Sequence, residues 1–468
     1  MSDKDLSLMA HLMRRAGFGA PMEELEARAA KGYESTVEEL LRPEEQPDLE
    51  RDIMMRYKTE WVSQAGLEGQ QEEWTFRMIN TKRPLQEKIA LFWHGILPTG
   101  HAKCEYPRQQ QMELDMFRTV GMGNFRDLLL DLAKDPAMVF YLDNCMSHKR
   151  AINENWGREL LELFSLGVGM DGNFNYNEDD VKEAARAFTG WTVTNSVPRY
   201  PYGKYEAKFI YDPNDHDNDS KTFLGETGNL NGEDIINITV KQPGAARFIA
   251  RHMYNYFVAD EPQVPAWKDT PPRDPGAIKI LEDEYFRSNY DITSMLRVLF
   301  NSDFFKKARF TKIKSPAETV IGTIRLVGDY TFPKPGLDAL TLNIRYMGQD
   351  LLNPPTVEGW HTGREWIDSG TLVERINFTA DQVGNANHPG IKAIIKRVGG
   401  NGGTLTPEQL VDGCLENLGS YQMAQETQTQ LIELAGSEGE IRTDSERFPS
   451  QVTAMLQSIV ATTEYLFA

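Results

Sequence analysis

The sequence predicts a mostly α-helical protein, a single large multi-helix globular fold with one small irregular or β-hairpin insertion near residues 195–230. Apolar residues recur every three or four positions along most of the 468 residues, which is the spacing of helices that bury one face. Hydrophobic residues make up 40% of the chain and charged residues 25%, a balance that favours a folded core. Residues 195–230 lack this spacing and are rich in Pro, Gly and Asp, which favours loops and a short hairpin.

Helix signals follow one another through the first third of the chain. The first 45 residues predict short helices, one of them beginning at Pro21, and a long polar helical pattern covers residues 50–79. Pro84 begins a helix whose apolar positions 85, 89, 92 and 96 face a core. A further amphipathic pair of helices is predicted over residues 112–132.

The central part contains the clearest helix boundaries. A strong helical pattern covers residues 153–166, and Gly167 ends it with a residue that tolerates left-handed backbone angles. Asn177 is placed to cap the next helix, which extends to about residue 190 and has acidic residues in its first turn.

Helical patterns resume from about residue 231 to 330 and return in the last hundred residues. We expect residues 1–380 to form one helical domain that includes the insertion at 195–230 and a Pro-rich linker at 260–276. Residues 381–468 are predicted to form a C-terminal helical segment packed on the same core, because no linker in the first 330 residues separates two self-sufficient halves.

Charge and composition exclude several classes of partner. The formal net charge is -19, and a field of that sign repels phosphate backbones and anionic lipids, so neither nucleic acid nor a membrane is an expected partner. The N-terminus shows no secretory signal and no apolar run is long enough to span a bilayer, which predicts a cytoplasmic protein. The three cysteines follow no metal or disulfide spacing and are expected to be reduced thiols.

The helix from residue 153 carries a polar stripe among leucines. Its members recur at i, i+3, i+4 and i+7 and so share one face: Asn155, Arg158, Glu159 and Glu162. A second pair, Glu183 and Arg186, follows on the next helix. One interpretation is a salt-bridge network that joins two helices. The other is a site in which Glu159 or Glu162 acts as general base or metal ligand and Arg158 clamps an anionic group.

Three further places carry candidate site residues. His216 and Asp217 lie in an irregular acidic loop, which is either a functional loop or a solvated turn. His94 lies on an apolar helix, where a packed histidine bonded to a carboxylate or carbonyl is the alternative. Asp143 precedes the 153–166 helix and either presents a carboxylate toward it or caps a loop.

The acidic loop also matches part of a calcium-binding pattern. Asp215, Asp217, Asp219 and Glu226 occupy positions 1, 3, 5 and 12 of a twelve-residue oxygen-ligand loop. Ser220 stands at position 6, where the sharp turn needs glycine. A divalent metal ion is therefore the one cofactor that the sequence suggests.

Four stretches together carry a resemblance to a known family. They are HLMRRAGFGAP (11–21), PLQEKIALFWHG (84–95), the run from YLDN to EAARAFTGW (141–191), and MGQDLLNPPTVEGWHTGREWI (347–367). Over roughly residues 8–380 the chain resembles the bacterial family catalogued as domain of unknown function 1800. The resemblance implies a mostly helical fold and no particular activity. Homologues are often exported, and their genes frequently neighbour those of a family resembling alkaline phosphatases and sulfatases.

The chain departs from the pattern of that family at two points. It lacks the export signal, and Trp93-His94-Gly95 is followed by Ile96 where relatives commonly show Trp-His-x-His-Phe. A metal site that needs both imidazoles cannot be built here.

These observations lead to two hypotheses of different classes. The first is an enzyme whose buried carboxylate, arginine and histidine site lies between the helices at 153–166 and 178–190 and the loop at 212–226, with acid–base or metal-assisted chemistry and an open substrate. The alternative is a non-catalytic scaffold or assembly partner of an alkaline-phosphatase- or sulfatase-like protein. A fainter resemblance links the central helix pair to animal-type haem peroxidases, although no histidine matches their haem ligand.

Overall fold

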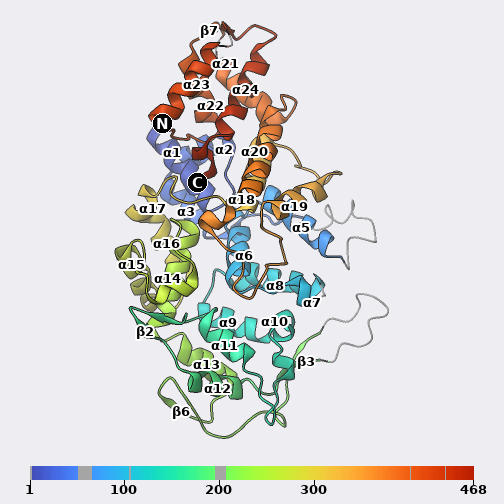
Figure 1. Ribbon diagram of the computed structural model, residues 1–468, viewed down its shortest axis with the longest axis vertical. Helices are drawn as coiled ribbons and strands as arrows, with labels where there is room; N and C mark the ends of the chain where they lie inside the picture. The colour runs from blue at the N-terminus through green and yellow to red at the C-terminus, as the bar shows by residue number, and fades with distance from the viewer. Residues whose placement is uncertain (1–2, 51–65, 105–106, 195–206, 401, 438) are drawn as a thin grey trace.

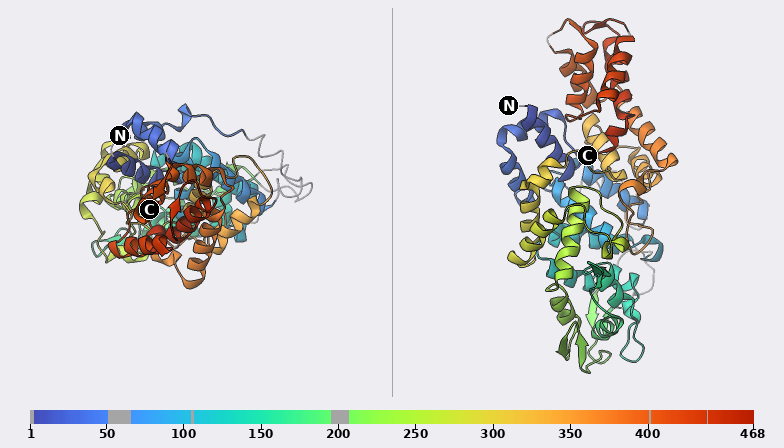
Figure 2. Two further views of the ribbon diagram at one scale, coloured as in Figure 1. Left: turned by 90° about the horizontal axis from the view of Figure 1, so that it is seen from above. Right: turned by 60° about the vertical axis from the view of Figure 1, so that its left-hand side comes forward.

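The computed structural model of the chain describes residues 3–50, 66–104, 107–194, 207–400, 402–437 and 439–468 (Figure 1). Within these ranges helices dominate, and the only sheets are four antiparallel pairs of short strands, which confirms the predicted mostly α-helical fold. The molecule is elongated, with the C-terminal helices at one end and the hairpins at the other (Figures 1 and 2). No helix in the described ranges has both the length and the apolar character needed to cross a bilayer.

The N-terminal third builds the middle of the molecule. Its helices are α1 (Asp3–Arg15), α2 (Met22–Lys31), α3 (Tyr33–Leu40), α5 (Leu67–Asn80), α6 (Pro84–Ile96), α7 (His101–Cys104), α8 (Pro107–Val120), α9 (Phe125–Lys134) and α10 (Pro136–Tyr141), with the short 3-10 turns η1 (Pro43–Glu45) and η2 (Asn144–Met146). Of the helix predicted over 50–79, residues 51–65 lie outside the described residues. Helix α6 begins at Pro84 as predicted, and its apolar residues Leu85, Ile89 and Phe92 are almost completely buried.

The next segment forms the lower end of the molecule in Figure 1. It contains α11 (Asn155–Glu162), α12 (Glu178–Ala187) and α13 (Gly232–Thr239), and the strand pairs β1–β2 (Gly169–Met170 and Asn173–Phe174), β3–β4 (Trp191–Val193 and Phe209–Tyr211) and β5–β6 (Lys221–Phe223 and Glu226–Gly228). Thr192 is paired with Ile210 and Thr222 with Thr227, so the predicted insertion at 195–230 does contain a hairpin and one strand of another. Residues 195–206 lie outside the described ranges.

Helix α11 is shorter than the predicted helix at 153–166. It begins at Asn155 and ends at Glu162, because the amides of Leu163 and Phe164 both bond to the carbonyl of Glu159 and break the helical hydrogen-bond pattern. The following helix agrees with its prediction: the Asn177 side chain accepts hydrogen bonds from the amides of Asp179 and Asp180 in a capping box.

The second half returns through the middle and then forms the upper end. It comprises α14 (Pro243–Phe257), η3 (Val264–Lys268), α15 (Pro275–Arg287), α16 (Ile292–Asn301), α17 (Asp303–Lys307), α18 (Pro316–Val327), α19 (Leu337–Tyr346), η4 (Gly363–Trp366), α20 (Ser369–Gly384), α21 (Pro389–Gly399), α22 (Pro407–Asn417), α23 (Gln425–Ser437), α24 (Phe448–Val460), η5 (Thr463–Leu466) and the strand pair β7–β8 (Thr404–Leu405 and Ile441–Arg442). The segment predicted as a linker at 260–276 is packed at Trp267, which is 8% exposed.

The predicted boundary at residue 381 falls inside α20. This helix packs against α18 on the side of the main body and against α24 on the side of the C-terminal segment. The end of the chain also returns to the main body, where Phe467 forms an antiparallel bridge with Ile313 and the amide of Lys314 donates to the carbonyl of Leu466. A continuous helix and a backbone pairing therefore both join the C-terminal segment to residues 1–380.

Candidate functional site

Helix α11 packs tightly against α12 because Gly157 lies at their contact. A Cβ atom at position 157 would lie 2.9 Å from the backbone nitrogen of Ala185, so a larger residue would force the helices apart. Leu160 and Leu161 are fully buried on the apolar side of α11. The polar stripe predicted from the sequence lies at the edge of this core: Asn155 is exposed, and Arg158, Glu159 and Glu162 are half-buried.

Arg158 is engaged by two carboxylates. Its guanidinium donates to Glu178 at 2.9 and 3.0 Å and to Glu154 at 3.3 Å. The hydrogen bonds to Glu178 raise the pKa of Arg158. The Glu178 side chain is 67% exposed, so this is a surface ion pair of the kind that contributes little to folding. Arg158 thus links α11 to the first turn of α12.

Glu159 and Glu162 form an acidic pair on the same face of α11. Burial raises the pKa of Glu159 to about 7, the neighbouring carboxylate of Glu162 adds to this rise, and Arg158 opposes it. The hydroxyl group of Tyr176 donates to Glu162 Oε2 at 3.5 Å. A carboxyl group that titrates near neutral pH beside a second carboxylate is an arrangement suited to general acid–base chemistry.

Hydrogen bonds and an ion pair around His216 hold the acidic loop against the end of α12. Arg186 Nε donates to Asp217 Oδ2 at 2.8 Å, and Arg186 Nη1 donates to Glu183 Oε2 at 2.8 Å. The imidazole of His216 is 3% exposed and its Nδ1 lies 2.8 Å from the carbonyl oxygen of Thr189. Burial lowers the pKa of His216. In this half of the predicted site the geometry matches the salt-bridge interpretation.

The structure therefore brings together Glu183, Arg186, Asp217 and His216, and it places Glu159 and Glu162 in a different group with Tyr176. Among the described residues, no hydrogen bond or ion pair joins either glutamate of α11 to His216 or Asp217.

The calcium pattern does not form a ligand cluster. The described residues contain no group of three or more His, Cys, Asp or Glu side chains placed to hold a metal ion. Asp215 is paired with His148, Asp217 with Arg186, and Glu226 lies exposed in β6. Lys221 is also part of this loop: its side chain is 1% exposed, and its ammonium group donates to the backbone carbonyl oxygens of Asp217 and Asp219. Two backbone oxygens of the loop are therefore already bound by an internal cation.

Asp143 lies apart from the α11 stripe. Its backbone has a φ of 57°, in the left-handed region, and its carboxylate pairs with Lys103 Nζ at 2.7 Å. The carboxylate makes no capping hydrogen bond to η2 and is instead paired with Lys103.

His94 is a packed histidine next to a carboxyl group. Its ring is fully buried between the indoles of Trp74 and Trp360, with ring centroids 5.6 and 5.4 Å away, and its Nδ1 lies 3.4 Å from Glu113 Oε2. Burial lowers the pKa of His94 to about 3 and raises the pKa of Glu113 to about 8. At neutral pH the pair therefore consists of an uncharged imidazole and a protonated carboxyl group.

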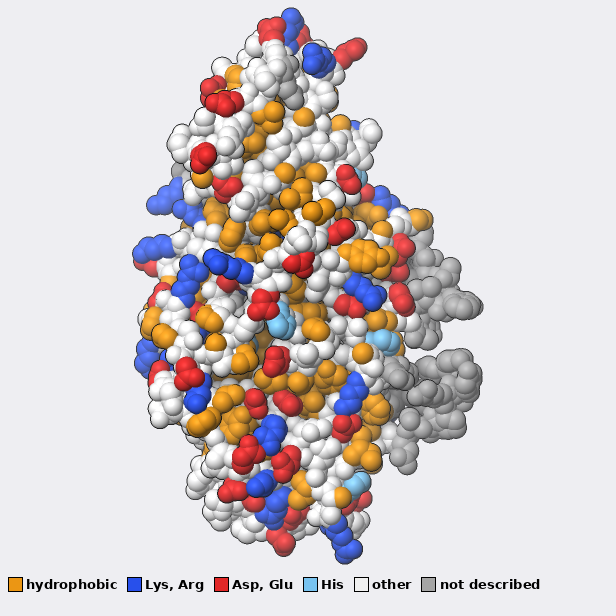
Figure 3. Space-filling view, in the orientation of Figure 1, with side chains coloured by type: hydrophobic (Ala, Val, Ile, Leu, Met, Phe, Trp, Pro, Cys, Tyr) orange, Lys and Arg blue, Asp and Glu red, His pale blue; other side chains and the backbone are white. Residues whose placement is uncertain are grey.

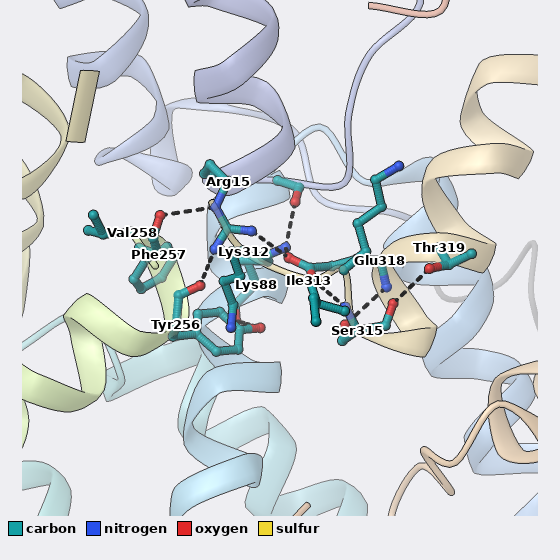
Figure 4. Close-up of polar contacts among 12 residues, drawn as sticks. Arg15, Lys88, Tyr256, Phe257, Val258, Lys312, Ile313, Ser315, Glu318 and Thr319 are labelled. Carbon is teal, nitrogen blue, oxygen red and sulfur yellow. Dashed lines mark hydrogen bonds and ion pairs between the residues drawn. The ribbon is translucent and has the colours of Figure 1, made fainter. Parts of the chain in front are cut away.

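A buried ion network that the sequence motifs did not reveal joins α1, α6 and α18 (Figure 4). Glu318, in the first turn of α18, accepts hydrogen bonds from Arg15 of α1 at 3.4 Å and from Lys88 of α6, and its other oxygen accepts from the amide of Ser315 at 2.7 Å. Against the upward effect of burial, Lys88 and Arg15 hold the pKa of Glu318 at about 2. Burial lowers the pKa of Lys88 to about 8.

The signal for this network was present in the motifs that carry the family resemblance. Arg15 lies in the stretch 11–21, and Lys88 interrupts the apolar run at 84–95. Charged residues inside an apolar helix require buried partners, but Glu318 is more than 200 positions away and nothing local identifies it. The Arg15 guanidinium also donates to the carbonyl oxygen of Phe257 at 3.0 Å, so the network joins four elements.

Next to this network lies a pocket between α1, α18 and the end of the chain. Its free volume is about 50 Å³. A cavity of this size has room for several water molecules or one compact anion. Polar and charged residues of the wall come from both the main body and the C-terminal segment: Arg14, Lys314, Glu318, Thr319, Thr323, Tyr421 and Tyr465.

Two cations, Arg14 and Lys314, line this pocket together with Glu318, and a third, Arg375, contacts Lys314 and Thr319 without lining the pocket. Arg14 donates through Nη1 to the carbonyl oxygen of Gly419 at 2.7 Å, but its Nε and Nη2 are shielded from solvent and have no partner. Arg375, which is 1% exposed, donates through Nη1 to the Lys314 carbonyl oxygen at 2.8 Å and to Thr319 Oγ1 at 3.0 Å, and its Nε and Nη2 are likewise unpartnered. The Lys314 ammonium donates to the carbonyl oxygen of Tyr465 at 2.6 Å.

Aromatic rings hold two of these cations in place. The guanidinium carbon of Arg14 lies 4.9 Å from the ring centroid of Phe310 and 5.0 Å from that of Tyr421. Lys314 Nζ lies 3.7 Å from the Tyr465 centroid and 4.9 Å from the Tyr421 centroid. Burial holds the pKa of Lys314 well below its usual value, and the neighbouring charge of Arg14 adds to this effect. The π faces attract these cationic side chains without supplying a negative charge.

Charged side chains of both signs are interspersed on the face of the molecule in Figure 3, with hydrophobic side chains gathered across its middle. This face therefore shows no large area of one charge sign.

Comparison with known protein families identifies a match over nearly the whole chain. A protein-family model described as "Protein of unknown function (DUF1800)" matches residues 11–467, so the similarity extends beyond the region of roughly residues 8–380 that carries the resemblance noted above. No curated protein matches the chain, and no solved structure matches it. The chain therefore belongs to the DUF1800 family.

Proposed function

We propose that this chain binds a small molecule through an anionic group, in the pocket between α1, α18 and the C-terminal segment. One observation carries the proposal: Arg14 lines the pocket and keeps two buried guanidinium nitrogens without a partner, and Lys314 lines the same pocket. The nearby carboxylate of Glu318 is already engaged by Arg15, Lys88 and the amide of Ser315.

Electrostatics explain why such a cluster favours a ligand. Buried charges without partners are costly, and cations that lie close together in a medium of low polarity repel one another. The low pKa of Lys314 reflects both effects. An anion in the pocket would satisfy the free nitrogens with charge-assisted hydrogen bonds, which are about twice as strong as neutral ones.

The first test measures whether anions stabilise the folded chain. In thermal unfolding of the full chain at constant ionic strength, we expect at least one compact oxyanion to raise the melting temperature. At about one hundred times the dissociation constant the gain is about 2.7 kcal/mol. Arg14→Gln should remove this stabilisation because it removes the guanidinium nitrogens that have no partner.

The matched control for charge is Arg287→Gln. Arg287 is 71% exposed on α15, where it pairs with Glu284, and the variant changes the net charge equally. We expect it to keep the anion-dependent stabilisation. The proposal fails if no anion in the series shifts the melting temperature, or if both variants lose the shift equally.

A second candidate function is acid–base catalysis at Glu159, as the sequence analysis expected of this helix. The observation in its favour is the half-buried position of Glu159 beside Glu162, where its carboxyl group titrates at about pH 7. A group with such a pKa is divided between its acid and base forms under physiological conditions.

Titration of Glu159 tests this second candidate. We expect Glu162→Gln to lower the pKa of Glu159 from about 7, because the variant removes the nearest like charge. The measurement is carboxyl carbon NMR of selectively labelled protein, with Glu226→Gln of the exposed β6 strand as the control that leaves the titration unchanged. A wild-type Glu159 that titrates at the ordinary value of a glutamate would remove the basis for this candidate.

A further inference from the structure

The guanidinium group of Arg14 keeps one free edge at the pocket. Its Nη1 atom donates to the carbonyl oxygen of Gly419 at 2.7 Å, whereas Nε and Nη2 are shielded from solvent and have no acceptor in the described part of the chain. These two nitrogens lie on one side of the planar group and can donate together to two oxygens of one anion. The bond to Gly419 and the rings of Phe310 and Tyr421 fix the orientation of this edge before any ligand binds.

We infer that the ligand of this pocket is a small monocarboxylic acid, whose carboxylate accepts hydrogen bonds from Nε and Nη2 of Arg14. The inference rests on the proposed function and names the ligand class for the same pocket. A carboxylate is planar and has two oxygens, so a single guanidinium edge matches it in the bidentate arrangement. The free volume of about 50 Å³ limits the ligand to a compact molecule.

The charges around the pocket favour a monoanion over a dianion. Arg14 supplies one full positive charge, because an arginine is not deprotonated in proteins. Burial and the charge of Arg14 hold the pKa of Lys314 well below its usual value, so the second positive charge is destabilised in the empty pocket.

Glu318 adds to this preference because its carboxylate also lines the pocket. The repulsion between this carboxylate and a bound anion grows with the charge of the anion. A phosphate monoester carries a charge of about -1.5 to -2 near neutral pH, whereas a carboxylate carries one negative charge. A dianion would therefore bring more negative charge into the pocket than Arg14 alone compensates, and buried charge without compensation is costly.

The rest of the wall suits the apolar body of a short organic acid. Apolar side chains from both the main body and the C-terminal segment line it: Phe18, Leu25, Leu326 and Leu418. Binding sites for small molecules commonly combine such apolar walls with a few polar groups that fix the orientation of the ligand. Each methylene group that is buried against this wall should strengthen binding about fourfold.

Calorimetric titration of the full chain with small anions tests the ligand class. At pH 7.5 and matched ionic strength, the probes are acetate, propionate, inorganic phosphate and sulfate. We expect acetate and propionate to bind at least ten times more tightly than phosphate or sulfate. We also expect propionate to bind more tightly than acetate, and the reverse order would overturn the assignment of an apolar ligand body.

A charge-conserving substitution isolates the guanidinium edge. Arg14→Lys keeps the positive charge but loses the paired N–H bonds, so acetate and propionate should bind at least ten times more weakly. Arg287→Lys on α15, at a position that is 71% exposed, is the matched control and should leave binding unchanged.

A measurement on the wild-type chain covers the case in which Arg14→Lys does not fold by circular dichroism. In NMR spectra of the ¹⁵N-labelled protein, acetate should shift one arginine Nε–H resonance and slow its exchange with water. Phosphate at the same concentration should leave that resonance unchanged.

The outcomes for this inference and for the proposed function differ. The carboxylate assignment is overturned, while anion binding stands, if phosphate or sulfate binds as tightly as acetate or if Arg14→Lys keeps the wild-type affinity for acetate. Bound acetate that leaves every arginine Nε–H resonance unchanged has the same consequence. Absence of binding by every anion overturns both.

Discussion

Replacing Glu318 by Gln is expected to lower the free energy of unfolding by about 3–5 kcal/mol, the cost of removing one partner of a buried ion network. The substitution leaves Arg15 and Lys88 buried without a negative charge, since these two side chains are fully buried and their remaining partners are backbone carbonyls. It also removes a carboxylate from the capping box at the start of α18. Urea unfolding followed by circular dichroism gives the measurement.

The pH dependence gives a second readout for Glu318. Its folded pKa of about 2 lies below the ordinary value of 4.5, so its contribution is present above pH 4.5 and is lost as the pH falls toward 2. The Gln variant should lack this component of acid unfolding. Glu178→Gln, which removes the exposed partner of Arg158, is the control and should leave the unfolding curve close to that of the wild type. If both variants unfold alike, the network does not stabilise the fold in this way.

Replacing Glu113 by Gln is expected to make the protein more stable at pH 8 than the wild type, by an amount on the order of 4 kcal/mol. Glu113 is fully buried, and its folded pKa of about 8 lies above the ordinary value of 4.5. Because the folded pKa of Glu113 is raised, the contribution of its protonated carboxyl group to the free energy of unfolding is complete below pH 4.5. This contribution is lost as the pH rises through 8. Gln carries no such titration, and its oxygen can accept the hydrogen bond that Thr99 Oγ1 makes to Glu113 Oε2 at 2.9 Å.

The measurement for Glu113 is the free energy of unfolding between pH 5 and pH 9. The wild type should lose stability across this range relative to Glu113→Gln, and the two curves should converge toward pH 5. Glu226→Gln in the exposed β6 strand should follow the wild-type curve. A constant difference between wild type and the Glu113 variant at every pH would refute a protonated carboxyl group beside His94.

Local signals predicted the helices well because helix starts depend on a few adjacent residues. Pro84 begins α6, and Asn177 caps α12 through hydrogen bonds to the next residues in the chain. The end of α11 was predicted four residues too late, since the leucine-rich pattern continues past Glu162 while the backbone turns toward Gly167. The spacing of apolar residues alone does not show where the backbone leaves the helical conformation.

The candidate sites were less predictable because their partners are distant in sequence. The stripe on α11 and the acidic loop were each identified, yet the structure places Glu162 with Tyr176 and His216 with Thr189. The calcium pattern described the acidic residues correctly but could not show that the ammonium group of Lys221 folds back among them. The scaffold role, the alkaline-phosphatase- or sulfatase-like partner and the cytoplasmic location stay predictions.

Helix α20 determines how the pocket can respond to a ligand. One wall of the pocket belongs to α18 and another to the segment that follows α22, and α20 packs against both α18 and α24 across what was predicted to be a segment boundary. A hinge between the two walls would have to break a regular helix in its interior. Ligand binding should therefore not require a large rotation of one part of the molecule relative to the other. The association rate should be limited by diffusion into the preformed cavity.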